Sequence, residues 1–316
     1  AVLDLETGAE SLYADDVDID DIVWMGPQPS VRSKAELVGV GENAGSTQDG
    51  VSAPYCKFFE AVAAAKAAGR LVHFVPQSRY YNQMHLAQVL GLAPELVSSR
   101  KLDGDSAASK ALVRAIVSMR LVKQDCEIEA IDDACDLGIE MHTIAREGCR
   151  PGVLEQEIVG RMEGITLSKG WGVSFTTILS QNGETLHNHT HHQIITPGRL
   201  LVVDAGAESN IHYASDFTRT YPCGGKFTPQ QKEIYDLVHS CNEFAFSMVR
   251  PGITYRDVHI ATVTKMLEGL KAAGLVSGDP AELAADGIGG LFMPHGLGHN
   301  IGLDVHDMED YGEDYV

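Results

Sequence analysis

The sequence has few basic residues and no long apolar run. Among its 316 residues, 24 are Lys or Arg and 44 are Asp or Glu, which gives a formal net charge of −20. A strongly acidic surface repels phosphate groups, so a nucleic-acid partner is disfavoured. No apolar stretch approaches the length of a membrane span, and residues 1–20 lack the basic flank and apolar core of a signal peptide. We therefore expect neither a nucleic-acid nor a membrane partner.

Cysteine pairs with metal-binding spacing are also missing. The six cysteines are scattered without a CxxC motif, which argues against a zinc finger or a disulfide framework. Scattered thiols fit a reducing compartment, so we expect a cytoplasmic protein. Apolar residues make up 44 % of the chain and charged residues 22 %, as in ordinary globular proteins. The length is enough for two domains.

Histidines gather in one stretch near the end, FMPHGLGHNIGLDVHD at 292–307. It holds His295, His299 and His306 among glycines and apolar residues. A single histidine in such a loop is an ordinary solvated side chain. Three of them in a glycine-rich apolar run favour a metal or proton-transfer site instead.

Two aspartates lie upstream on predicted strands. The run LLVVDAG at 200–206 predicts a buried strand ending in Asp204, and YASDFTRTY at 213–221 predicts a second strand with Asp216. A turn between them would make a hairpin and bring both acids together. Close carboxylates repel, so they need a cation or a shared proton; the alternative is that each acid caps or pairs locally. Together with one imidazole, these carboxylates make an oxygen-rich ligand set, which is typical of Mn, Co or Zn sites and differs from a site built from thiolates.

The motifs VVDAG, SDFTRTY and MPHGLGHNIGLDVHD together resemble the creatinase-like Xaa-Pro peptidases, aminopeptidase P and prolidase. LHNH at 186–189 and KFTPQQKEIYDLV at 226–238 add to the resemblance. It is strong after about residue 110 and weak before. The resemblance implies an α/β (α+β) protein, with a partial N-terminal α/β domain at 1–105 and a pita-bread metallopeptidase domain at 106–316.

The resemblance also implies a site of two divalent metal ions. Manganese is the expected metal, with cobalt or zinc as alternatives. The implied metal ligands are Asp204, Asp216, which would bridge the two ions, and His299. The residues implied to bind substrate and stabilise the tetrahedral intermediate are His187, His295 and His306. A hydroxide held between the metals would be the nucleophile, and the other histidines of HNHTHH at 187–192 are expected not to be ligands.

The implied function is an aminopeptidase that cleaves the Xaa-Pro bond of peptides with proline at the second position, acting as a dimer. The family has two further glutamate ligands on later strands, and the sequence up to Val316 shows neither motif. We therefore expect the chain to be truncated at its C-terminal end. The alternatives are a prolidase that splits Xaa-Pro dipeptides, or a non-catalytic pita-bread binding protein that lacks these glutamates.

Apolar spacing and breakers predict the other elements. We expect a loop at 40–54 and a domain boundary near residue 105. The two helices expected within 232–273 would pack against the sheet that holds the site. The remaining predicted elements are helices at 57–69, 82–92, 106–147 and 154–170, and strands at 1–5, 71–76 and 171–180.

Overall fold

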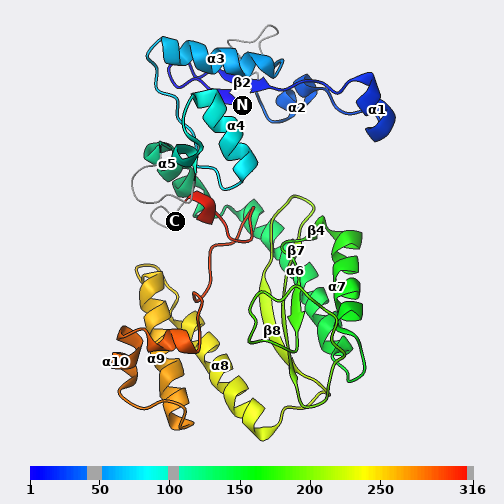
Figure 1. Ribbon diagram of the computed structural model, residues 1–316, viewed down its shortest axis with the longest axis vertical. Helices are drawn as coiled ribbons and strands as arrows, with labels where there is room; N and C mark the ends of the chain where they lie inside the picture. The colour runs from blue at the N-terminus through cyan, green and yellow to red at the C-terminus, as the bar shows by residue number, and fades with distance from the viewer. Residues whose placement is uncertain (41–51, 99–106, 312–316) are drawn as a thin grey trace. The chain divides into compact units, whose positions relative to one another are not determined.

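The computed structural model describes residues 1–40, 52–98 and 107–311 (Figure 1). Its contacts divide it into two units: residues 1–120 with the described residues after 308, and residues 121–308. The boundary predicted near residue 105, and most of the loop predicted at 40–54, lie outside the described residues. No helix in the described ranges is long and apolar enough to cross a membrane.

The first unit is a small mixed α/β body. Strand β2 (Glu10–Tyr13) pairs antiparallel with β1 (Val2–Leu3) and parallel with β3 (Ser52–Ala53). The helix predicted at 57–69 is confirmed as α3 (Cys56–Ala67), and Gly69, at φ +72°, follows its end. The other helices are α1 (Ile19–Met25), α2 (Val31–Leu37), α4 (Tyr80–Leu90), η1 (Pro94–Val97) and α5 (Lys110–Arg120).

The buried strand predicted at 71–76 is wrong. These residues form no strand, and Leu71 is 84 % exposed. Val72 and Phe74 instead pack against a core cluster that includes Val62 of α3 and Leu90 of α4. The apolar alternation is therefore accounted for by contact with helices, without a neighbouring strand.

The second unit is built on antiparallel strands. Its main sheet has the order β5 (Ile178–Ser180), β6 (Leu200–Ala205), β8 (Phe217–Pro222). A shorter pair joins β4 (Gly172–Val173) to β7 (Ala207–Glu208). Helices α6 (Asp125–Gly148) and α7 (Glu155–Lys169) lie beside the strands (Figure 1) and share one core cluster with them. The helix predicted at 154–170 is confirmed as α7.

Two predicted elements are interrupted. The helix predicted at 106–147 is two helices in the structure, α5 and α6, which are separated at residues 121–124. A capping box starts α6, because the Glu127 carboxylate accepts from the Gln124 N–H and Gln124 caps in return. The strand predicted at 171–180 is likewise divided into β4 and β5.

The helices predicted within 232–273 are confirmed as α8 (Pro229–Met248) and α9 (Tyr255–Ala272). Their predicted packing against the sheet is wrong. The buried residues Val263, Leu267 and Leu270 of α9 form a cluster with Ala284 of α10 (Pro280–Ala285). Leu237 of α8 packs against this cluster, so the apolar faces of these helices cover one another. Two short 3₁₀ helices follow, η2 (Ile288–Leu291) and η3 (Glu309–Tyr311).

Candidate active site

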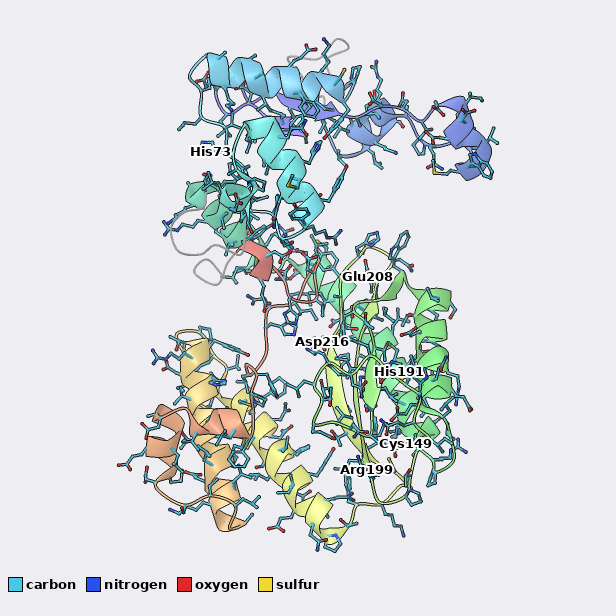
Figure 2. All side chains as sticks on the ribbon, viewed as in Figure 1. His73, Cys149, His191, Arg199, Glu208 and Asp216 are labelled. Carbon is cyan, nitrogen blue, oxygen red and sulfur yellow. The ribbon has the colours of Figure 1, made fainter. Side chains whose placement is uncertain are left out.

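Asp204 lies on β6, and Asp216 directly precedes β8, the antiparallel neighbour of β6, so the second predicted strand begins one residue after Asp216. Leu201, Val203 and Ala205 of β6 are fully buried, so strand alternation directs Asp204 to the opposite face. Asp204 is paired in register with Thr218 of β8, whose Oγ1 donates a hydrogen bond of 2.8 Å to Asp204 Oδ1. Asp216 (labelled in Figure 2) directly precedes β8, two residues before Thr218, so strand alternation assigns it to the same face as Thr218.

The environment of Asp204 disfavours a negative charge. Burial and, to a smaller extent, the neighbouring Asp216 carboxylate together raise the pKa of the Asp204 carboxyl to about 6. The hydrogen bond from Thr218 and the charge of His187 oppose this shift in pKa. The acid pair is therefore short of positive charge, which a proton or a cation would supply.

His299 brings an imidazole to the same place. Its Nε2 lies 3.0 Å from Asp216 Oδ2, and its Nδ1 lies 2.9 Å from the Asn300 carbonyl oxygen. The carbonyl can only accept, so Nδ1 carries hydrogen and a neutral ring turns its Nε2 lone pair toward the carboxylate. Two acceptors then face each other unless a proton or a cation lies between them.

The other predicted histidines are placed differently. The His306 ring stacks on the His299 ring, with centroids 4.0 Å apart and planes at 22°. His187 is exposed and lies near the His189 ring, 6.3 Å away. His295 is exposed, and in the described part of the chain no hydrogen bond joins it to either acid. The structure therefore brings four predicted residues together, Asp204, Asp216, His299 and His306, with His187 close enough to influence Asp204 electrostatically.

The donor atoms fit a divalent cation in their chemistry. Carboxylate and imidazole are common ligands of borderline ions such as Mn²⁺, Co²⁺ and Zn²⁺. The raised pKa of Asp204 and the facing acceptors on Asp216 and His299 both indicate a place that lacks positive charge. In the described ranges, no group of three or more His, Cys, Asp or Glu side chains is arranged as a ready metal site. The predicted ligands Asp204, Asp216 and His299 have the right chemistry for a cation, and the structure places His299 beside Asp216.

A close backbone contact joins the two acid-bearing segments. Ser215 is fully buried; its hydroxyl donates to the Ala134 carbonyl at 2.8 Å and accepts from the Ala207 N–H at 3.0 Å. A Cβ at Gly206 would lie 1.7 Å from the Ser215 carbonyl oxygen. Only glycine allows this approach. Sequence reasoning missed both residues as determinants of the site, although each lies within two residues of an acid, in the DAG and SD motifs.

The loop that carries His187 is anchored at both ends. The fully buried Glu155 accepts from the backbone N–H of Gln181 at 2.9 Å, and the Gln181 side-chain oxygen accepts from the Thr196 N–H at 2.7 Å. Between them, His191 Nδ1 donates to a β5 carbonyl at 3.0 Å (Figure 2). No short sequence motif reveals these contacts, because the partners are separated along the chain.

A buried ion pair was also missed. Lys123 Nζ lies 2.8 Å from Asp307 Oδ2, and the two side chains are 14 % and 1 % exposed. The partners are 184 residues apart. Asp307 was visible as a carboxylate at the end of the histidine-rich stretch, but nothing in the sequence pointed to Lys123.

Comparison with known proteins gives consistent results. The Xaa-Pro aminopeptidase of Escherichia coli is 39 % identical over 199 residues, which are 62 % of this chain and 45 % of that protein. A probable Xaa-Pro aminopeptidase of Metarhizium acridum is 29 % identical over 94 % of this chain and 55 % of its own length. The chain thus spans about half the length of these curated relatives.

Solved structures match over nearly the whole chain. A substrate complex of an E. coli aminopeptidase P variant has a TM-score of 0.74 at 28 % identity and covers 96 % of this chain and 67 % of its own. Pseudomonas aeruginosa aminopeptidase PepP has a TM-score of 0.75 at 27 % identity, over 94 % of this chain and 65 % of its own. The mixed α/β fold is the pita-bread fold of these structures.

The family model for metallopeptidase family M24 matches residues 129–315. This range holds all the predicted ligands and histidines, and it is more than half of the chain. The resemblance expected from the motifs is thereby confirmed, and the chain belongs to metallopeptidase family M24.

Proposed function

We propose that this protein is a metal-dependent Xaa-Pro aminopeptidase, which removes the first residue of peptides with proline at the second position. One observation carries the proposal: in a member of family M24, Asp204 on β6, Asp216 just before β8 and His299 on a distant loop lie close together. The relatives that match over most of this chain are named Xaa-Pro aminopeptidases or probable ones.

In this proposal Asp204, Asp216 and His299 would be the residues of this chain that hold divalent metal ions. When bound, such ions supply Lewis acidity, which polarises a scissile carbonyl and lowers the pKa of water. The carbonyl of Asn300 orients His299 by accepting from Nδ1, which leaves Nε2 to face the acids. Thr218 holds one oxygen of Asp204 in place.

The remaining histidines are proposed to act on the substrate. His306 lies against the His299 ring, so its side chain is beside the residues proposed to hold the metal. A positioned imidazole there can hold or move a proton on the substrate. His187 and His295 are exposed on their loops, where they can contact a peptide.

The test combines metal content with peptide cleavage. Purified protein is analysed for bound metal and assayed on Ala-Pro and Ala-Pro-Ala with and without added Mn²⁺. Close to two metals per chain with cleavage of the tripeptide supports the proposal. Cleavage of the dipeptide alone would select a prolidase instead.

A non-catalytic peptide-binding protein is the second candidate. It is favoured by one observation, namely that the described residues present no set of three ligands ready for a metal. Peptide binding without metal uptake or cleavage would support it over the peptidase.

Several finer assignments belong to the same proposal. We propose manganese as the working metal, with cobalt and zinc as alternatives, a cytoplasmic location, and a dimer. All six cysteines are free thiols, which fits a reducing compartment. Activity titrations with each metal and light scattering of the purified protein test the metal and the oligomeric state.

A further inference from the structure

The histidine loop, residues 293–307, has no helix or strand of its own in the structure. It still has to place His299 within hydrogen-bonding distance of Asp216. A glycine-rich segment without a backbone ladder loses much conformational entropy when it is ordered. Some other interaction must therefore hold it.

One such interaction is the buried Lys123–Asp307 ion pair. Asp307 is 1 % exposed and Lys123 14 % exposed, with Nζ 2.8 Å from Oδ2. A carboxylate so far from solvent is stable only with a charged partner. Lys123 lies in the break before α6, so the pair ties the end of the loop to the start of that helix.

The loop also folds around the Asp307 carboxylate. A Cβ at Gly302 would lie 2.6 Å from Oδ2 and 2.8 Å from Cγ of Asp307. The backbone N–H of Asp307 donates to the Asn300 carbonyl at 3.0 Å. Residues 300–307 therefore turn around the Asp307 carboxylate, and His299 directly precedes this turn.

The same turn is connected to the segment that contains Asp216 and leads into β8. The Gly302 carbonyl accepts a hydrogen bond of 2.9 Å from the N–H of Ala214, which lies two residues before Asp216. Next to Ala214, the Tyr213 hydroxyl donates to the Glu127 carboxylate in the first turn of α6 at 2.9 Å. Both the loop and the entrance to β8 are therefore held at the beginning of α6.

We propose that Lys123 and Asp307 are positioning residues, whose buried ion pair holds the histidine loop against Ala214 so that His299 and His306 lie at the acid pair. The effect on peptide cleavage rests on the proposed function. The effect on the loop does not, because it follows from contacts within the protein.

The test uses Lys123→Met, which removes the charge and keeps most of the side-chain length. Because this change leaves Asp307 buried without a partner, the double variant Lys123→Met with Asp307→Asn is made as well. The double variant lacks both charges and the ion pair but contains no isolated buried charge. The matched control is Lys169→Met, which breaks the Lys169–Glu140 pair on α7 and α6, where both side chains are about half exposed.

Four readouts are compared: amide hydrogen exchange of the metal-free protein, Mn²⁺ affinity, kcat and KM on Ala-Pro-Ala, and melting temperature. In the double variant we expect faster exchange confined to residues 299–307, and Mn²⁺ binding weakened by about tenfold or more. We also expect a lower kcat with little change in melting temperature. Lys169→Met should match wild type in all of them.

Unchanged exchange at 299–307, with Mn²⁺ affinity equal to that of the control, would overturn the inference. So would faster exchange throughout α6 and the sheet in step with a lower melting temperature, because that shows a general role in stability. If wild type binds Mn²⁺ but cleaves no Xaa-Pro peptide, the proposed function fails, and exchange and affinity still decide the role of the ion pair.

Discussion

The candidate site combines two regions that are held in different ways. Asp204 and Asp216 lie on or beside paired strands, where the register of β6 and β8 sets their positions. His299 and His306 lie on a loop without regular structure, held by the Lys123–Asp307 pair and single backbone hydrogen bonds. The strands would keep the acids in place without the loop, whereas the loop depends on partners far away in the sequence.

Because of this difference, substitutions in the strands and substitutions in the loop should affect the site in different ways. A change in a strand is resisted by a ladder of backbone hydrogen bonds, so it harms the site mainly when it damages the fold. A change in the loop can move the histidines while the rest of the unit stays folded. Substitutions that affect stability and activity in different proportions can test this contrast.

The largest effect is expected from removing a predicted metal ligand, whether from the strand region or from the histidine loop. Asp204→Asn and His299→Ala should each reduce Xaa-Pro cleavage by about 10³-fold, because each takes away a group that stabilises charge at the site. Peptide kinetics and elemental analysis check this result, and circular dichroism confirms the fold. His189→Ala is the control, since His189 is exposed on the adjacent loop. Full activity in either variant would show that the ligand assignment is wrong.

Two glycine substitutions compare strand and loop directly. Gly206→Ala should destabilise the protein by about 3 kcal/mol, because its Cβ would lie 1.7 Å from a backbone oxygen. Gly302→Ala should cost less, about 1 kcal/mol, because the Asp307 side chain can move away, yet it should weaken Mn²⁺ binding. Urea unfolding measures the first quantity and metal titration the second.

The control for both is Gly160→Ala on α7, where a Cβ would meet nothing within 4 Å. It should stabilise the protein by about 0.5–1 kcal/mol through helix propensity. Equal losses of stability at Gly206 and Gly302 would contradict the contrast between the two regions.

A third prediction concerns His306, which contacts the His299 ring. His306→Ala should lower kcat by about 10²-fold while metal content stays near that of wild type, because the imidazole is proposed to act on the substrate. Parallel measurements of kcat and bound metal decide the matter. Loss of metal in proportion to activity would make His306 a ligand.

The smallest effect is expected behind the sheet, at the buried His142. Burial lowers the pKa of His142 below its ordinary value of 6.5, so the folded state keeps the ring neutral. Its stabilising effect is complete above pH 6.5 and is lost as the pH falls from there through the folded-state pKa, because the unfolded chain binds the proton more tightly. His142→Gln should therefore flatten the decline in the free energy of unfolding below pH 6.5.

Urea unfolding at a series of pH values measures that decline. The exposed variant His189→Gln is the control, and it should keep the slope of wild type. An unchanged slope in His142→Gln would assign the decline to other groups.

Much of the strand-borne half of the site was predictable. Alternation in 200–206 and 213–221 indicated two strands, and the hairpin placed Asp204 near Asp216, because strand period and pairing are local properties. The helices at 57–69 and 154–170 were predicted for a similar reason, since helical periodicity and terminating glycines act within a few turns.

Other features could not be derived locally. The strand predicted at 71–76 failed because its apolar residues contact helices, and the helix predicted at 106–147 failed because a capping box starts α6 after a break. Both outcomes depend on which neighbour is available in space. A run of apolar residues predicts that the segment is buried, but it does not determine which element the segment packs against.

The sequence by itself determined the acid-bearing hairpin and the presence of a histidine-rich glycine loop. Only the tertiary structure decided that the loop folds around Asp307 and pairs with Lys123, 184 residues away. The physical reason is the range of the interactions involved. Backbone periodicity acts between neighbours along the chain, whereas a buried charge needs a partner that only the folded chain can bring to it.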